Sequence, residues 1–404
     1  MTSTKKKQHS GQTHHQVQSL HKKHKAPSNN NDDDSLEGEE GQDYVYDEFI
    51  LSLTKTNIAH FEHSTPLHKK RRTDHKDLSS RHEIVVSHRD ESLQSIFDKL
   101  LKNKILSCPV LKQGGLFYGM VDLLDIIKFI VDETGKKHFK KATSFFEVEE
   151  FKNVNVGQLM EYPYGKSIKY QKLSPSTSLF TAFESLAKQS INRIAVVDDR
   201  EEVVDIITEF DLIHWVYDNV EKLGSRRSRK VSQINAANQY VMSVLEDEQV
   251  IDAFKLIKIM GVGGVAVIQE NGTLVGNLSA RDIKKIGNAG ENWKRLFSPV
   301  FEFIDREPIT CSLDDTLEDI LEIFVNKSVH RVYIVDEMFK TIGVVTLRDI
   351  IGELMPMSSH SMPVPLFDSE FRSNMSNIPP DIPKVVPTAS ATAVAQPRVT
   401  PVVQ

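Results

Sequence analysis

Two short stretches of this sequence place a hydroxyl three residues ahead of a carboxylate. They are SARDI, with Ser279 and Asp282, and TLRDI, with Thr346 and Asp349. An aspartate at the start of a helix, beside a hydroxyl, can accept two hydrogen bonds from neighbouring sugar hydroxyls while nearby backbone amides leave room for a base. The same pattern is typical of a helix cap, in which the carboxylate binds only its own backbone. The sequence alone is compatible with both roles.

Weaker copies of this step occur twice earlier in the chain. One is TEFDL, with Thr208 and Asp211, and the other is DLLDI, in which Asp122 takes the hydroxyl position ahead of Asp125. A second carboxylate in that position repels a phosphate group. The first copy is therefore the least suited to an anionic ligand.

Basic residues stand just before an apolar strand pattern in two of the four copies. His330 and Arg331 precede VYIVD, and Arg193 precedes IAVVD. A cation at the start of a buried strand, facing a neighbouring sheet, suits a phosphate group. The aligned pairs in the other two copies are Leu106-Ser107 and Gly263-Gly264. The cations therefore occur in every second copy.

One spacing is common to the four copies and identifies an internal repeat. An apolar residue that opens a helix pattern, a strand residue and the aspartate stand sixteen residues apart, at positions 93, 109 and 125; 179, 195 and 211; 250, 266 and 282; and 317, 333 and 349. Each copy begins with apolar residues at helical spacing and continues with two strand patterns and a closing helix start. A β-α-β-β-α unit of this size exposes one sheet face, so the copies are expected to pack in pairs, in an α+β fold.

Composition limits the possible functions. The chain has 404 residues, a net charge of −6 and two cysteines that are far apart, Cys108 and Cys311. These features favour neither a nucleic-acid partner nor a cysteine-ligated metal. No apolar run is long enough for a membrane span, and the N-terminus lacks a signal-peptide pattern, which predicts a cytoplasmic or nuclear protein without membrane contact.

At these residues the chain resembles the CBS domain, whose copies pack in pairs called Bateman modules. The stretches EDEQVIDAFKLIKIMGVGGVAVIQENGTLVGNLSARDI and VHRVYIVDEMFKTIGVVTLRDII are similar to the gamma regulatory subunits of AMP-activated protein kinase and of its plant sucrose-non-fermenting-related counterparts. Repeats are expected at 84–130, 166–218, 238–287 and 305–355, in modules spanning 44–220 and 232–356. A basic, solvated connector is expected at 221–231, with disordered tails at 1–43 and 357–404.

The resemblance implies a non-catalytic subunit that senses AMP, ADP and ATP and binds a kinase catalytic subunit and a beta-type scaffold subunit, without a cofactor. The parts of the chain outside the repeats are too short for a catalytic domain, which needs about a hundred residues. An alternative is a CBS scaffold or phosphatase inhibitor that binds nucleotides weakly or not at all.

In the family, the aspartate of an odd-numbered repeat shares a ligand with the basic residues of the next repeat. The resemblance therefore implies that Asp282 and Ser279 hold a ribose whose phosphate meets His330 and Arg331. Asp125 is similarly expected to act with Arg193. Further candidate ligand residues are Asp349 with Thr346, and Asp211 with Thr208. A cation for the Asp349 site is expected from Arg295 or Arg306.

Overall fold

The structure is a computed structural model that describes residues 43–61, 84–134, 147–162, 171–188, 191–234, 241–287 and 290–356. The two expected tails lie outside these ranges, apart from residue 43. Among the helices in the described ranges, none is both long and apolar enough to cross a membrane.

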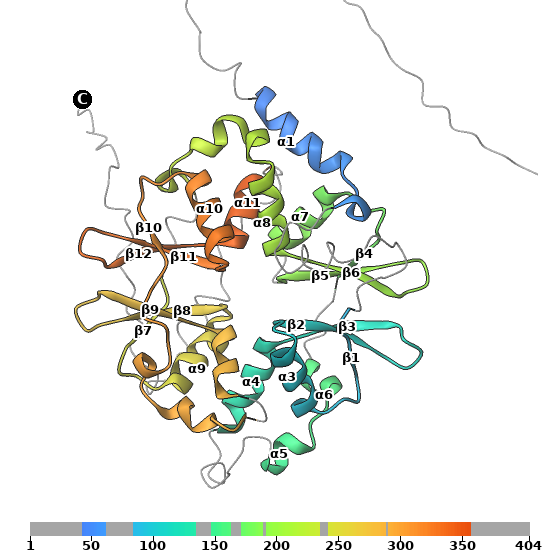
Figure 1. Cartoon of the computed structure of the whole chain (residues 1–404), viewed down its shortest axis with the longest axis vertical. Coiled ribbons are helices and arrows are strands. Elements are labelled where there is room, and N and C mark those ends of the chain that lie inside the picture. The colour runs from blue at the N-terminus through green and yellow to red at the C-terminus, as the bar shows by residue number, and fades with distance from the viewer. Residues whose placement is uncertain are drawn as a thin grey trace, which may run out of the picture. The chain divides into compact units, whose positions relative to one another are not determined.

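The four repeats fold alike, as their common spacing predicts (Figure 1). In each repeat a short first strand pairs in parallel with the middle strand, which pairs antiparallel with the last strand. One helix follows the first strand and another follows the last. The predicted β-α-β-β-α order is confirmed.

The first elements of the described residues are helix α1 (Asp43–Lys55) and η1 (Ile58–His60). Repeat 1 consists of β1 (Ser87–His88), α3 (Leu93–Lys102), β2 (Ser107–Leu111), β3 (Phe117–Asp122) and α4 (Leu123–Thr134). Helices α5 (Glu149–Lys152) and α6 (Val156–Met160) separate it from repeat 2, which consists of β4 (Lys172–Leu173), α7 (Leu179–Lys188), β5 (Arg193–Val197), β6 (Val203–Thr208) and α8 (Glu209–Asp218).

The second half begins with η4 (Val220–Ser228) and η5 (Val231–Gln233). Repeat 3 consists of β7 (Ser243–Leu245), α9 (Val250–Met260), β8 (Gly264–Ile268), β9 (Leu274–Ser279) and a 3-10 closing helix, η7 (Ala280–Ile286). Two more 3-10 helices, η9 (Trp293–Phe297) and η10 (Val300–Glu302), lead to repeat 4, which consists of β10 (Thr310–Cys311), α10 (Leu317–Lys327), β11 (Arg331–Val335), β12 (Thr341–Thr346) and α11 (Leu347–Leu354).

Helix α10 shows why each repeat begins as it does. Its N-cap Thr316 accepts a hydrogen bond at Oγ1 from the backbone amide of Asp319, at 3.2 Å, which satisfies an end of the helix that would otherwise lack a partner. The four apolar residues at helical spacing are all buried: Leu317, Ile320, Leu321 and Phe324. The helix therefore covers one face of its own sheet and leaves the other face for a partner repeat.

Sheet faces join the repeats in consecutive pairs. Between repeats 3 and 4, a small apolar core contains Ala266, Leu274 and Tyr333. Between repeats 1 and 2, the corresponding core contains Met120 and Ala195. This pairing is the predicted arrangement of two Bateman modules.

Helices join the repeats in a second way, which the sequence did not predict. Helix α4 of repeat 1 contacts α9 and η7 of repeat 3, and α8 of repeat 2 contacts α10 and α11 of repeat 4. One large apolar core consequently contains residues of repeats 1 and 3, and another contains residues of repeats 2 and 4. Each repeat thus shares buried surface with two others.

The connector at 221–231 is packed against repeat 4. Leu223, Arg226 and Val231 are buried, and the Val231 amide donates to the Asp315 carbonyl at 2.8 Å. The expectation of a solvated connector is therefore wrong. The basic composition of the segment does not show which of its individual side chains are buried.

Candidate functional site

Strand register places the two parts of the predicted site next to each other in every repeat. The residue that opens the middle strand lies opposite the residue that ends the last strand, in the pairs Ser107 and Asp122, Arg193 and Thr208, Gly264 and Ser279, and Arg331 and Thr346. The basic residue of a repeat therefore begins beside the hydroxyl of its own repeat. Its long side chain can extend from there toward the partner.

All four aspartates bind the start of their own closing segment. Oδ2 of Asp349 accepts from the Thr346 amide at 2.8 Å and from its hydroxyl at 2.6 Å, and Asp211 binds Thr208 in the same way at 2.9 and 2.6 Å. In repeat 1 the Asp122 amide donates to Asp125 Oδ2 at 3.1 Å. The capping role that the sequence left open is thus confirmed.

Asp282 has a second charged neighbour. Its Oδ2 accepts from the Ser279 amide and hydroxyl at 2.8 and 2.9 Å, and its Oδ1 lies 3.0 Å from the ammonium of Lys285. The same ammonium donates to the Phe303 carbonyl at 3.0 Å and lies 3.4 Å from the Asp305 carboxylate. Lys285 would therefore keep other partners if a ligand hydroxyl took its place at Asp282.

Arg331 extends from repeat 4 into repeat 3. Its guanidinium lies so close to Gly263 and Gly264 that a Cβ on Gly263 would stand 2.8 Å from Nη2, and one on Gly264 would overlap the group. A Cβ on Gly264 would also stand 2.7 Å from the Leu278 carbonyl oxygen, so this position requires glycine while Arg331 keeps its place. The glycine pair in repeat 3 and the arginine in repeat 4 are therefore two halves of one contact.

Other polar groups of the two repeats meet near this contact. The Tyr333 hydroxyl in repeat 4 donates to Asn277 Oδ1 in repeat 3 at 2.7 Å. Burial raises the pKa of Tyr333 to about 12, and the charge of Asp282 adds to this effect while Arg331 opposes it. The structure thus brings Asp282 and Arg331 to the same interface, as the sequence-based pairing requires.

Repeats 1 and 2 make the equivalent contact with a weaker acidic partner. Arg193 of repeat 2 donates a hydrogen bond to the Ser107 hydroxyl of repeat 1. Burial and then the Asp122 carboxylate raise the pKa of Asp125 to about 7, although Lys128 and Arg193 lower it. Asp125 is thus only partly charged at neutral pH, which makes it a poorer acceptor of ligand hydroxyls than an ionised aspartate.

His330 does not carry a positive charge at neutral pH. Burial lowers its pKa to about 3, with a further contribution from the charges of Arg281, Arg193 and Arg331. The imidazole ring lies parallel to the Phe210 ring, with 5.7 Å between the ring centroids. The positive charge at this site therefore belongs to the arginines, and His330 can offer a hydrogen bond.

The comparison with known protein families agrees with this geometry. The model of the CBS domain matches residues 76–132, 166–218, 231–288 and 300–356. The chain belongs to the CBS domain family. Each match contains the three strands and the closing aspartate of one of the four repeats.

Proteins named as gamma subunits of protein kinases are among its relatives. The chain is 28% identical over 342 residues to the SNF1-related protein kinase regulatory subunit gamma-1 of Arabidopsis thaliana, covering 69% of this chain and 80% of the relative. It is 23% identical over 297 residues to the 5'-AMP-activated protein kinase subunit gamma of Saccharomyces cerevisiae, covering 70% and 90%. A solved structure from Methanocaldococcus jannaschii matches with a TM-score of 0.53 and 21% identity over 67% of this chain and 96% of that chain, which shows a common fold.

The predicted cations for Asp349 in the fourth CBS repeat have other partners. Arg295 donates to the Lys285 and Glu302 carbonyls at 3.4 and 3.3 Å, and Arg306 lies 3.4 Å from the Glu246 carboxylate. Their guanidinium groups are thus engaged within and around repeat 3. The second carboxylate near Asp349 is that of Glu209. Burial raises the pKa of Glu209, and the charge of Asp349 adds to this effect, although Arg348 opposes it.

Sequence reasoning missed two cations of the third CBS repeat. Arg281 and Lys284 belong to the closing segment, and burial and then the charge of Arg281 lower the pKa of both His330 and Lys284. Arg281 is visible in the sequence as the arginine of SARDI. It stands between the hydroxyl of Ser279 and the carboxylate of Asp282, so the pattern assigns it no role of its own.

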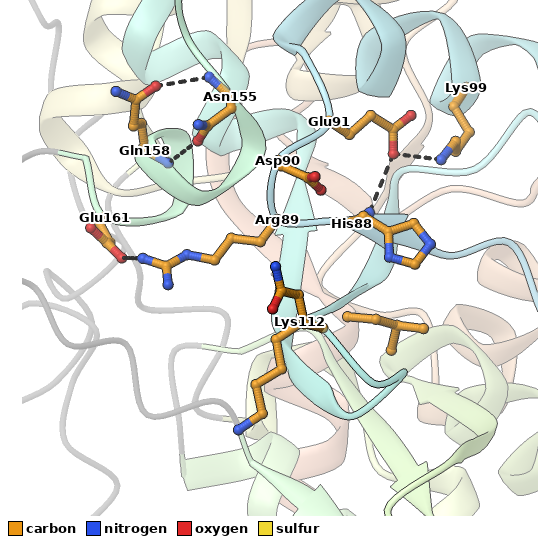
Figure 2. Close-up of a pocket in the computed structure, with 11 residues that line it drawn as sticks. His88, Arg89, Asp90, Glu91, Lys99, Lys112, Asn155, Gln158 and Glu161 are labelled. Atoms are coloured by element: carbon orange, nitrogen blue, oxygen red, sulfur yellow. Dashed lines mark hydrogen bonds and ion pairs between the residues drawn. The ribbon is translucent and has the colours of Figure 1, made fainter.

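A separate hollow of about 990 Å³ lies between the first CBS repeat and helix α6 (Figure 2). Four of its charged groups form two ion pairs: Arg89 lies 2.7 Å from Glu161, and Lys99 lies 2.7 Å from Glu91. None of the predicted ligand residues lines it. This hollow is therefore a weaker candidate for the predicted ligand than the repeat interfaces.

Proposed function

We propose that this chain is a non-catalytic regulatory subunit of a serine/threonine protein kinase complex that senses adenine nucleotides. AMP, ADP and ATP compete for the interface between CBS repeats 3 and 4. The carboxylate of Asp282, beside Ser279, accepts the ribose hydroxyls, and Arg331 binds the phosphate while His330 donates a hydrogen bond to it.

The observation that carries this proposal is the passage of Arg331 from repeat 4 over the glycine pair of repeat 3. An arginine that crosses to the repeat bearing Asp282 combines a cation and a sugar-binding carboxylate at one interface. Neither repeat has both groups in this arrangement alone. Because the chain is similar to kinase gamma subunits, the ligand to test is an adenine nucleotide and the partner to test is a protein kinase.

The mechanism is thermodynamic coupling. Nucleotides with one, two or three phosphates meet the arginines differently, so they stabilise different arrangements of the repeats or of a bound kinase. The remaining aspartates, Asp125 with Arg193, Asp211 with Thr208 and Asp349 with Thr346, are secondary candidates at the other interfaces. No phosphate bond is broken in this scheme, and no cofactor is required.

One observation favours a second function. Asp282 already binds its own backbone and Lys285, so a CBS scaffold or phosphatase inhibitor with weak or no nucleotide binding would show the same contacts. The two functions differ in their partners. Both place the chain in the cytoplasm or nucleus.

Affinity purification of the full, tagged chain from its own cells separates the two functions. The proposed function predicts a kinase catalytic subunit together with a beta-type subunit, and it predicts that AMP alters the activity of the captured kinase. Capture of phosphatase subunits, without a kinase, would support the scaffold instead. The Arg331→Ala chain serves as the control, because its kinase should no longer respond to AMP.

A further inference from the structure

Two arginines occupy the same position in repeats 3 and 4, but only one is neutralised. Arg348 of TLRDI lies across the interface with repeat 2, where its guanidinium meets the Glu209 carboxylate at 2.9 Å. It also donates to the Ile191 carbonyl at 3.1 Å and to Asn192 Oδ1 at 2.6 Å. Arg348 is therefore held by three acceptors of repeat 2.

Arg281 of SARDI is the equivalent residue at the interface between repeats 3 and 1. Alignment of repeats 1 and 2 shows that Leu123 stands where repeat 2 has its glutamate, and Leu106 where it has its asparagine. The third acceptor, the Ile105 carbonyl, receives the Lys284 ammonium at 2.7 Å. Repeat 1 thus offers Arg281 none of the three acceptors that bind its counterpart.

The surroundings of Arg281 are rich in positive charge. Its side chain is exposed, and among the described residues it has no hydrogen bond or ion pair. Burial, and then the charges of Arg281 and Arg193, lower the pKa of Lys284 to about 8. After burial, the charges of Arg281, Arg193 and Arg331 all lower the pKa of His330. Like charges that act on the same side chains repel one another, and a bound anion lowers this repulsion.

We infer that Arg281 binds phosphate groups and that its counterpart Arg348 does not, so that the anion-binding surface of this chain is one-sided. The anion approaches from the side of repeats 1 and 3, where Arg193 and Lys284 add to the attraction. The ion pair with Glu209 closes the opposite side. This inference rests on the proposed function for its nucleotide ligand, but the charge arrangement applies equally to inorganic pyrophosphate.

Matched substitutions test the inference in the full chain. Calorimetric titrations with AMP and with pyrophosphate should show binding at least about tenfold weaker for Arg281→Gln, and a smaller loss for Arg281→Lys, which keeps the charge. Arg348→Gln should lower the melting temperature, because it leaves Glu209 buried without its partner, yet change both affinities less than about twofold. The melting temperature of Arg281→Gln should equal or slightly exceed that of the parent, since the side chain is exposed and its loss relieves repulsion between like charges.

The outcomes separate this inference from the proposed function. If AMP binds and Arg281→Gln binds it equally well, or if both glutamine variants lose the same affinity, the inference is overturned and the proposed function stands. Binding of pyrophosphate that depends on Arg281, without binding of AMP, would support the inference and refute the nucleotide sensor. Absence of binding by AMP and pyrophosphate to the parent chain would overturn both.

Discussion

The imidazole of His330 links the charge of the site to the stability of the fold. Its pKa is about 3 in the folded chain and about 6.5 in a solvated histidine. Between these values the unfolded chain binds the proton and the folded chain does not. The free energy of unfolding should therefore fall as the pH drops below about 6.5.

Urea denaturation at pH 7.5 and pH 5.5 checks this effect. His330→Gln should reduce the difference in unfolding free energy between the two pH values by about 1 kcal/mol, because it removes the proton that only the unfolded chain takes up. His88→Gln, a change at an exposed edge of repeat 1, is the matched control for the substitution itself and is measured at the same two pH values. An equal pH dependence in the parent and in His330→Gln would show that the ring is solvated.

At this scale the sequence predicted residue positions better than residue charges. The aspartates and the alternating arginines could be found because the sixteen-residue spacing aligns them. The neutral state of His330 and the pKa of about 7 for Asp125 could not, because both depend on burial and on neighbours from other repeats.

Among the elements, η4 carries the largest difference from the sequence-based expectation. Arg226 is 5% exposed, donates from Nη1 to the Leu354 carbonyl at 3.2 Å, and places its guanidinium 5.1 Å from the Phe49 ring centre. This one side chain thus joins α1, η4 and the end of α11. A composition of Ser, Arg and Lys gave no sign of that role, because amphipathic periodicity cannot be detected in so short a 3-10 helix.

Removal of Arg226 should therefore destabilise the fold. Arg226→Ala leaves a buried carbonyl without its donor and a gap beside Phe49, at a cost of about 1–3 kcal/mol in unfolding free energy. Arg227→Ala, at the neighbouring exposed ion pairs with Glu221 and Glu318, should change it by less than about 1 kcal/mol. Equal effects of the two substitutions in chemical denaturation would contradict the packed arrangement.

For the whole molecule, the repeats are connected through two kinds of interface. Sheet faces pair repeats 1 with 2 and 3 with 4, and helices pair 1 with 3 and 2 with 4. The sheet pairing followed from the sequence, since each unit leaves one sheet face uncovered. The helix pairing did not follow from the sequence. An apolar residue on the outer side of a helix indicates that the residue is buried, but it does not indicate which repeat buries it.

This arrangement predicts one cooperative unfolding transition for the four repeats. Because every repeat shares a core with two others, neither module can lose its structure without exposing apolar residues of the other. Calorimetry and circular dichroism should give coincident midpoints, and trypsin should cleave slowly at the connector. Two separated transitions, or rapid cleavage at Arg226 and Arg227 with survival of both halves, would show independent modules.

Titration of the full chain with AMP, in the parent and in Asp282→Ala, tests the central claim most directly. Asp319→Ala is the matched control, because Asp319 makes the same contacts with Thr316, at 2.8 and 2.6 Å, at a helix start away from the predicted ligand residues. Loss of either cap should lower stability by about 0.5–2 kcal/mol. If Asp282 also binds the ribose, Asp282→Ala should bind AMP about ten- to a hundredfold more weakly and Asp319→Ala should bind it like the parent. Unchanged affinity in Asp282→Ala, or no binding of AMP by the parent chain, would contradict the account.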